Sequence, residues 1–480
     1  MGLVFVPIYI SNLGVESYGL IGIFVSLQAW LGMLDMGMSA TLNREMARFS
    51  AGEHTAQSIR NLLRSVEVVY IAIVLLISTI VWRAAPWIAS DWLNVQKLPL
   101  DAVINAMQIT GLVVALRMME GLYRGVLQGL QLQVWFNGAN SILATLRWGG
   151  AAIAVWHTPT IVMFFYWQMF ASFLGTIVLA VKVYSNLPVA RNGGAFQVDE
   201  LLKVWRFSGG LIAITFLALL LTQVDKILLS KLLSLEAFGL YTLATTLVSA
   251  LYMLVYPISN AFYPQFVQLH AQDNKEMIAD SYHKGCQLIS LLVIPPAVVL
   301  AFFSEPVLRL WTQNADTAVR VAPIVVPLIL GTLFNGLMTL PYMMQLAYGW
   351  TGLTIRVNIV AVSILIPALL TVVPKYGPVG AAYLWLFLNV GYVFIAVHFM
   401  HLRILPHEKW RWYIDDIVIP LAAAVAAASV MRAVLPVATS VWGEVGCLSV
   451  AGVFVFMTTG IVIKTIRELV FQRFQLFYRQ

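Results

Sequence analysis

Charged residues are scarce in this sequence. They make up 11% of the 480 residues, whereas hydrophobic residues make up 60%. A soluble domain usually carries about 25% charged residues, so this chain is expected to be an integral membrane protein. The apolar runs are about 20 residues long, which is the length a helix needs to cross a bilayer. Outer-membrane strands would instead give alternating runs of about 10 residues.

Signatures of metal binding, disulfides and catalysis are also lacking. The two cysteines, Cys286 and Cys447, lie in or beside apolar runs, which favours small core residues over a disulfide framework or a metal site. The sequence has no Gly-x-x-x-x-Gly-Lys-[Ser/Thr] loop and no His-Glu-x-x-His motif. Its polar stretches are too short for a soluble catalytic domain. We therefore expect no enzyme activity, no metal and no cofactor.

Length and polarity predict an all-α fold with about fourteen membrane-spanning helices. The first apolar run is too short to cross a bilayer. We expect the first helix to be truncated because the chain begins inside a longer reading frame; a short first helix is the alternative. The predicted spans cover, roughly, residues 1–11, 18–42, 66–89, 103–123, 135–156, 160–181, 208–230, 239–263, 285–308, 320–346, 357–373, 379–400, 413–434 and 441–463.

An internal repeat predicts two similar lobes. Residues 16–20 read Glu-Ser-Tyr-Gly-Leu and residues 236–240 read Glu-Ala-Phe-Gly-Leu, and a long apolar run follows each. Six spans per copy is an even number, so both copies enter the membrane from the same side and form a parallel repeat. The substrate site is then expected between the lobes, near the midplane. The predicted parts are an N-terminal six-helix lobe at 1–184, a cytoplasmic linker at 185–206, a C-terminal six-helix lobe at 207–400, and a helix pair with a basic tail at 401–480.

The distribution of Lys and Arg predicts the orientation. Of the 29 Lys and Arg residues, 19 fall on one side of the predicted membrane, 7 on the other and 3 within spans. Basic residues concentrate in cytoplasmic loops, so we expect both termini to be cytoplasmic. The net charge of +7 therefore indicates membrane topology, not nucleic-acid binding.

The span at 103–123 carries ionisable residues, which are costly in a bilayer and usually face an interior or a water-filled cavity. Arg117, Glu120 and Arg124 follow one another at steps of three and four, so they share a helix face. One interpretation is the charged wall of a cavity, with Arg117 facing an anionic ligand. The alternative is a self-neutralised pair of Arg117 and Glu120, with Arg124 reaching the membrane surface.

The span at 135–156 carries Asn137, Asn140, Ser141 and Arg147, which we predict to share one face. Arg147 lies near mid-span with no acid close in sequence, so it needs a partner, water or an anion. A guanidinium group is well suited to bidentate phosphate binding. The alternative is an ion pair with Glu120 or Asp35 from a neighbouring helix.

Asp35 and Lys226 are further ionisable residues with a possible role in transport. Asp35 shares a face with Gln28 and Ser39, and it is either a protonatable carboxylate that couples ion movement to transport or a structural partner for an arginine. Glu120 is the second candidate for ion coupling. Lys226 either faces the cavity or forms an interfacial pair with its neighbour, Asp225.

The span at 239–263 carries a stripe of hydroxyl and aromatic residues. Tyr252 and Tyr256 lie on it, and rings with hydroxyls suit contacts with sugars. Helix packing uses the same residue types, so both interpretations stay open.

Several short motifs resemble those of one family. Residues 13–20 (Leu-Gly-Val-Glu-Ser-Tyr-Gly-Leu), followed by 34–37 (Leu-Asp-Met-Gly) and 43–45 (Asn-Arg-Glu), are similar to the N-terminal signature of polysaccharide transporters. These are the O-antigen and capsule flippases of the multidrug/oligosaccharidyl-lipid/polysaccharide exporter superfamily. Asp225-Lys226 and residues 236–241 resemble that family's second-lobe opening.

The resemblance implies a V-shaped, two-lobe transporter in the bacterial inner membrane. It would flip an undecaprenyl-diphosphate-linked oligosaccharide from the cytoplasmic to the periplasmic leaflet, driven by an ion gradient. It also implies a cationic central cavity, for which Arg117 and Arg147 fit by position. A glycan polymerase or ligase is a partner suggested by the family and not by any residue.

Three other functions stay open. A cation-coupled multidrug exporter of the same superfamily predicts acids in the cavity, and the arginines argue against it. A peptidoglycan-precursor flippase shares the chemistry and differs in cargo. A membrane scaffold for glycan assembly would tolerate the loss of charge at Arg147.

Overall fold

The computed structural model describes residues 2–32, 38–188, 194–198, 223–436, 440–465 and 467–468. In these residues the chain is helical, apart from turns and an isolated bridge between Asn94 and Ser234. The prediction of an all-α fold is confirmed. The chain forms two compact units, Met1–Gly239 and Leu240–Gln480. The predicted lobe boundaries and the linker at 185–206 stay predictions.

Ten helices of the described residues are long and apolar enough to cross a membrane, so the chain is a multi-pass membrane protein. Two of them, α1 (Gly2–Leu31) and α14 (Thr351–Gly391), are kinked at glycines with positive φ. Gly14 has φ 79° and Gly377 has φ 59°, a conformation that costs glycine little. Each kinked helix therefore covers parts of two predicted spans. The count of fourteen stays a prediction, because most of the span at 208–230 lies outside the described residues.

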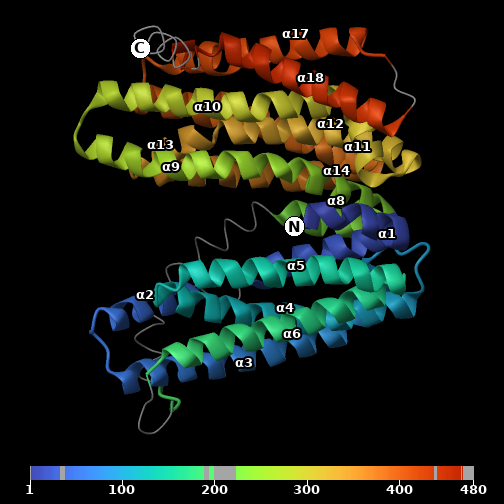
Figure 1. Cartoon of the computed structure of the whole chain (residues 1–480), viewed down its shortest axis with the longest axis vertical. Helices are drawn as coiled ribbons and strands as arrows, with labels where there is room; N and C mark the ends of the chain where they lie inside the picture. Colours follow the sequence, from blue (N-terminus) through green and yellow to red (C-terminus); the bar gives the residue numbers. More distant parts are fainter. Residues whose placement is uncertain are drawn as a thin grey trace. The chain divides into compact units, whose positions relative to one another are not determined.

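The first unit is a bundle built around α4 (Figure 1). α4 packs against α2, α3 and α6, while α5 packs against α1 and α6. The predicted span at 18–42 is not one helix in the described residues, since α1 ends at Leu31 and α2 begins at Met38. The other elements of this unit are α2 (Met38–Ser50), α3 (Ala56–Trp87), η2 (Ile88–Trp92), α4 (Leu100–Gly129), α5 (Gln133–His157), α6 (Ile161–Asn186), a helix at 223–232 and the first residues of α8 (Leu235–Val248).

In the second unit, α10 packs against α9, α12, α17 and α18 (Figure 1). A helix so placed connects the C-terminal helix pair to the rest of the unit. The elements that follow α8 are η3 (Ser249–Leu251), α9 (Tyr252–Ala271), α10 (Lys275–Phe302), α11 (Ser304–Thr312), α12 (Ala315–Leu337), α13 (Thr339–Ala347), α14, η4 (Tyr392–Ala396), α15 (Val397–Arg403), α16 (Lys409–Arg411), η5 (Trp412–Val418), α17 (Ile419–Val434) and α18 (Val441–Val462).

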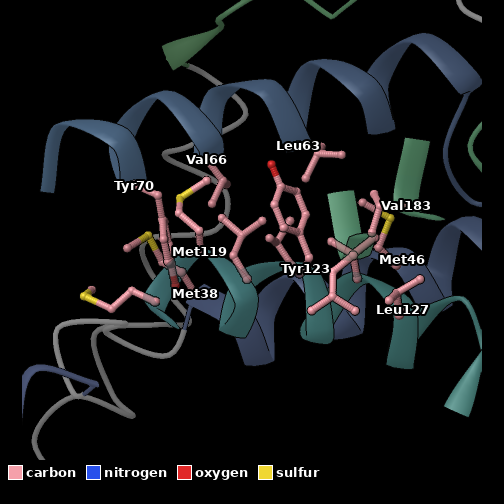
Figure 2. Packing of buried hydrophobic residues seen from close by; sticks show 14 of the residues in the cluster. Met38, Met46, Leu63, Val66, Tyr70, Met119, Tyr123, Leu127 and Val183 are labelled. Atoms are coloured by element: carbon pink, nitrogen blue, oxygen red, sulfur yellow. The ribbon is translucent and has the colours of Figure 1, made fainter. Parts of the chain in front are cut away.

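Figure 2 shows a buried apolar cluster of the first unit. Val66 and Tyr70 of α3 face Met119 and Tyr123 of α4 across it. Flexible methionine side chains fill irregular gaps between helices. Between membrane helices, close packing of this kind supplies much of the stability, because lipid is as apolar as the side chains.

One carboxylate ties three of these helices together. Glu67 of α3 is 2% exposed and accepts hydrogen bonds from the hydroxyls of Tyr123 (3.0 Å, α4) and Tyr184 (2.6 Å, α6). Arg64, one turn earlier, lies 3.4 Å from the same carboxylate. A buried carboxylate with three partners holds α3, α4 and α6 in register.

The repeated motif has a structural role in the first unit. The carboxylate of Glu16 accepts hydrogen bonds from the backbone N–H groups of residues 96–98, at 2.6–3.1 Å. Glu236, its counterpart in the repeat, pairs with Lys97 at 2.7 Å. Both glutamates therefore anchor the segment that leads into α4.

The glycines of the motif lie against each other. A Cβ atom added at Gly19 would come within 2.3 Å of the carbonyl oxygen of Leu235, and one added at Gly239 within 2.2 Å of that of Val15. Only glycine allows backbones to approach this closely. The two copies of the motif thus cross at their glycines.

Candidate functional site

A polar cavity of about 330 Å³ lies inside the first unit. Its charged side chains come from α4 and α5. The polar residues that line it include Gln28, Arg117, Glu120, Arg124, Asn140 and Arg147. The three charged residues of α4 thus share a face, as their spacing predicts.

Arg147 forms an ion pair with Glu120 inside this cavity. Nη2 of Arg147 donates to Oε2 of Glu120, and the two residues are 6% and 8% exposed. Among the described residues, Nε of Arg147 and Oε1 of Glu120 have no hydrogen-bond partner. The alternative interpretation of Arg147, a pair with an acid from a neighbouring helix, therefore describes this structure. Glu120 therefore neutralises the positive charge of Arg147.

Arg117 has no such carboxylate partner in the described part of the chain. Its Nη2 donates to the amide oxygen Oε1 of Gln168 at 3.1 Å, and its Nε has no partner there. Glu120, one turn away, is bonded to Arg147 instead, so the pair of Arg117 and Glu120 given above as the alternative is not formed. A neutral amide accepts the hydrogen bond but leaves the positive charge unmatched.

Arg124 adds a third guanidinium group to the cavity. It is exposed, and none of the described carboxylates forms a salt bridge with it. Three arginines therefore meet one glutamate, so two positive charges are unmatched among the described residues. Such a cavity attracts anions.

The predicted polar face of α5 is divided in the structure. Asn140 lines the charged cavity together with Arg147, whereas Asn137 is exposed and does not line it. Ser141 lines a separate, mainly apolar cavity of about 1080 Å³ between α1 and α5. At about 100° per residue, Ser141 and Arg147 point about 120° apart. The prediction that all four residues share one face is therefore wrong.

The other predicted residues of the first unit lie elsewhere. Gln28 and Ser39 line the cavity, but Asp35, between them in sequence, lies outside the described residues. Lys226 lines a different cavity of about 270 Å³, beside Trp30 and several other aromatic side chains. Its Nζ donates to Gln223 Oε1 at 3.1 Å, so Lys226 does not join the arginine cavity.

Tyr252 and Tyr256 belong to the second unit. The hydroxyl of Tyr252 donates to Asn335 Oδ1 at 3.0 Å, and its ring stacks on that of Tyr256 with centroids 5.7 Å apart. Ser259, on the same stripe, donates to its own helix backbone. These contacts favour helix packing over sugar contact as the role of Tyr252. Tyr256 is 57% exposed and keeps a free ring surface.

Sequence reasoning missed two residues of α6. Gln168 is fully buried and accepts from Arg117. A Cβ atom added at Gly175 would lie 2.6 Å from Glu120 Oε1 and 3.0 Å from Arg147 Nη2. The two are seven residues apart, so they share a face of α6. A glutamine in an apolar span, with a glycine two turns later, was the available signal.

Sequence comparison decides the family. The model of the family described as "Polysaccharide biosynthesis protein" matches residues 1–270, more than half of the chain. This chain belongs to that family. A second model, MatE, matches residues 211–371 of the chain. Together with the relatives below, these matches make the chain a polysaccharide transporter of the multidrug/oligosaccharidyl-lipid/polysaccharide exporter superfamily.

One curated relative of this transporter is a putative O-antigen transporter of Shigella flexneri. It is 21% identical over 379 residues, which cover 78% of this chain and 87% of the relative. Among solved structures, the lipid II flippase MurJ in an inward closed conformation has a TM-score of 0.74 at 14% identity, covering 98% of this chain and 97% of MurJ. An inward-facing multidrug resistance MATE transporter has a TM-score of 0.67 at 12% identity, covering 85% and 94%. The structural likeness establishes the fold. All three relatives are transporters or flippases by name.

Proposed function

We propose that this transporter flips an undecaprenyl-diphosphate-linked oligosaccharide from the cytoplasmic to the periplasmic leaflet of the bacterial inner membrane. It works by alternating access and is driven by an ion gradient. The observation that carries the proposal is the cavity in the first unit, where Arg117 and Arg124 have no matching carboxylate among the described residues. The name of the Shigella flexneri relative supports a cargo of this class.

The physical problem is the charge of the cargo. A diphosphate cannot cross about 30 Å of hydrocarbon unaided, and fixed cations in a wet cavity lower that barrier. Arg117 is the strongest candidate for the contact, because its only described partner is neutral and its Nε still lacks one. Asn140 lines the same cavity and offers an amide to an adjacent oxygen.

The remaining residues have secondary parts in this proposal. Arg147 holds Glu120 and offers its unpartnered Nε. Glu120 is the ion-coupling candidate that the cavity contains, while Asp35 remains a prediction from sequence. The exposed ring of Tyr256 is proposed to contact sugars.

The charge of the cavity argues against export of cationic drugs. A cation site needs unmatched acids, whereas Glu120, the one acid among the described residues that line this cavity, is already paired with Arg147. An added cation would meet two unmatched arginines and be repelled.

Cells whose surface glycan depends on this transporter test the proposal. Arg117→Gln is expected to lower glycan display at least tenfold at normal membrane abundance, because glutamine removes the unmatched charge but keeps a donor for Gln168. Arg117→Lys should retain part of the display. The matched control is Arg83→Gln, which removes the same charge from an exposed residue of α3. Normal display in Arg117→Gln would mean that this charge is not a substrate contact.

A further inference from the structure

A second buried polar cluster lies in the other unit and involves none of the residues discussed above. His283 of α10 is 2% exposed, and Asp416 of η5 is fully buried. Nδ1 of His283 lies 2.5 Å from Asp416 Oδ2, and its Nε2 lies 2.9 Å from Glu408 Oε2. Both nitrogens of one imidazole therefore face carboxylate oxygens.

This arrangement determines how many protons the three groups hold. A neutral imidazole has one N–H donor and one acceptor nitrogen, and an ionised carboxylate only accepts. With a neutral ring and two ionised carboxylates, one contact would set an acceptor against an acceptor. Two short hydrogen bonds need one more proton, carried either by the ring or by a carboxylate. The geometry thus requires two protons on the three groups.

The neighbours of the cluster show which atoms share that proton. Gln287 accepts at Oε1 from the backbone N–H and the hydroxyl of Thr465, at 3.0 and 2.6 Å, which directs its amide nitrogen to Asp416. That nitrogen donates to Asp416 Oδ1 at 2.9 Å, so Oδ1 is an acceptor. The additional proton therefore lies along the line from Glu408 through His283 to Asp416 Oδ2.

We propose that His283, Asp416 and Glu408 form a proton-binding site. The side chain of Glu408 is 24% exposed while that of Asp416 is 0% exposed, so protons enter at Glu408 and pass through the imidazole ring. Ionisable groups buried in membrane proteins commonly serve as proton relays.

The site also fastens the C-terminal helix pair. It joins α10 to the segment that leads into α17, and Gln287 extends it to Thr465, just after α18. Figure 1 shows α17 and α18 beside α10, and both helices pack against it. Loss of the proton would set two acceptors against each other at this junction. The hold of α10 on the helix pair would then weaken.

Other charged or titratable groups surround the site without bridging its two short contacts. Arg411 lies 3.3 Å from Glu408, on the partly exposed side of the site. His401 of α15 is bonded to the hydroxyl of Tyr282 at 3.2 Å and is a second titratable imidazole nearby. Arg432 of α17 and Glu444 of α18 make their contacts with Phe302 and Arg309, towards the opposite end of α10. Cys286, Lys409, Tyr413 and the exposed Asp415 are further titratable groups near the site.

Thermal unfolding of the full-length protein in detergent, measured from about pH 6 to about pH 9, tests the proposal. Above about pH 7 an unfolded chain carries neutral histidine and ionised carboxylates. The folded cluster then holds one proton more, so the unfolding equilibrium constant should rise by up to tenfold per pH unit until that proton is lost.

The decisive variant is Asp416→Asn. Its amide nitrogen donates to Nδ1 of a neutral His283, while its oxygen still accepts from Gln287, so no additional proton is needed. The pH dependence of unfolding should disappear. Glu408→Gln, at the partly exposed end of the site, should also abolish the pH dependence. It replaces Asp416→Asn as the test variant if that buried substitution prevents folding. His401→Gln, the matched control, should keep the wild-type pH dependence.

Two results would overturn the proposal: wild-type unfolding that does not change with pH, or an unchanged pH dependence in both Asp416→Asn and Glu408→Gln. Because the measurement involves no transport, it stands or falls separately from the proposed cargo.

Discussion

Replacing Arg147 with alanine is expected to lower the free energy of unfolding by about 3–5 kcal/mol, because it leaves the buried carboxylate of Glu120 without its partner. Thermal unfolding of the purified protein and its abundance in membranes both measure the loss. Arg147→Lys keeps a cation beside Glu120 and should lose much less.

A double variant distinguishes the ion pair from simple packing. Glu120→Gln combined with Arg147→Gln removes both charges and keeps two polar groups of similar size. It should recover most of the stability that Arg147→Ala loses. If the double variant is as unstable as Arg147→Ala, the stability at this position does not come from matched charge.

The second large effect is expected at Gly175 of α6. Its Cβ position lies 2.6 Å from Glu120 Oε1 and 3.0 Å from Arg147 Nη2, so Gly175→Val would have to displace the ends of both side chains of the buried ion pair. Overpacking of this kind typically costs about 1–3 kcal/mol, to which a weakened buried ion pair adds. Thermal unfolding and glycan display should both fall.

Gly32 provides the matched control for Gly175. It lines the same cavity, and no atom of the described residues lies within 4 Å of its Cβ position. Gly32→Val adds the same side chain to the same cavity without touching the pair, so it should be tolerated far better. Equal losses in the two variants would show that bulk in the cavity matters, and not the ion pair.

Much of the fold and part of the site could be predicted from sequence. The all-α membrane fold follows from long, continuous apolar runs with few charges. In lipid, a helix satisfies its own backbone hydrogen bonds along such a run, whereas barrel strands would alternate in polarity. Arg117, Glu120 and Arg124 line one cavity because their spacing alone places them on one face of α4. The repeated motif marked two segments that the structure brings together at Gly19 and Gly239.

What sequence could not supply were contacts between helices. It left open whether Arg147 meets an anion or Glu120, because that choice depends on how α4 and α5 pack. The same limit hid Gln168, whose neutral amide leaves the charge of Arg117 unmatched. Of the two arginines predicted to hold the diphosphate, Arg117 is therefore the stronger candidate, because Arg147 is already paired with Glu120.

The charged cavity is proposed to recognise the diphosphate of a lipid-linked substrate. The most direct test is equilibrium binding of two lipids to the purified transporter in detergent, an undecaprenyl diphosphate and the uncharged undecaprenol. We expect the wild-type protein to bind the diphosphate at least tenfold more tightly, since hydrogen bonds to charged groups are worth about 1.5–3 kcal/mol. Arg117→Gln should lose most of that preference while it binds undecaprenol as before. Equal affinity of the wild-type protein for the two lipids, or an undiminished preference in Arg117→Gln, would contradict the account.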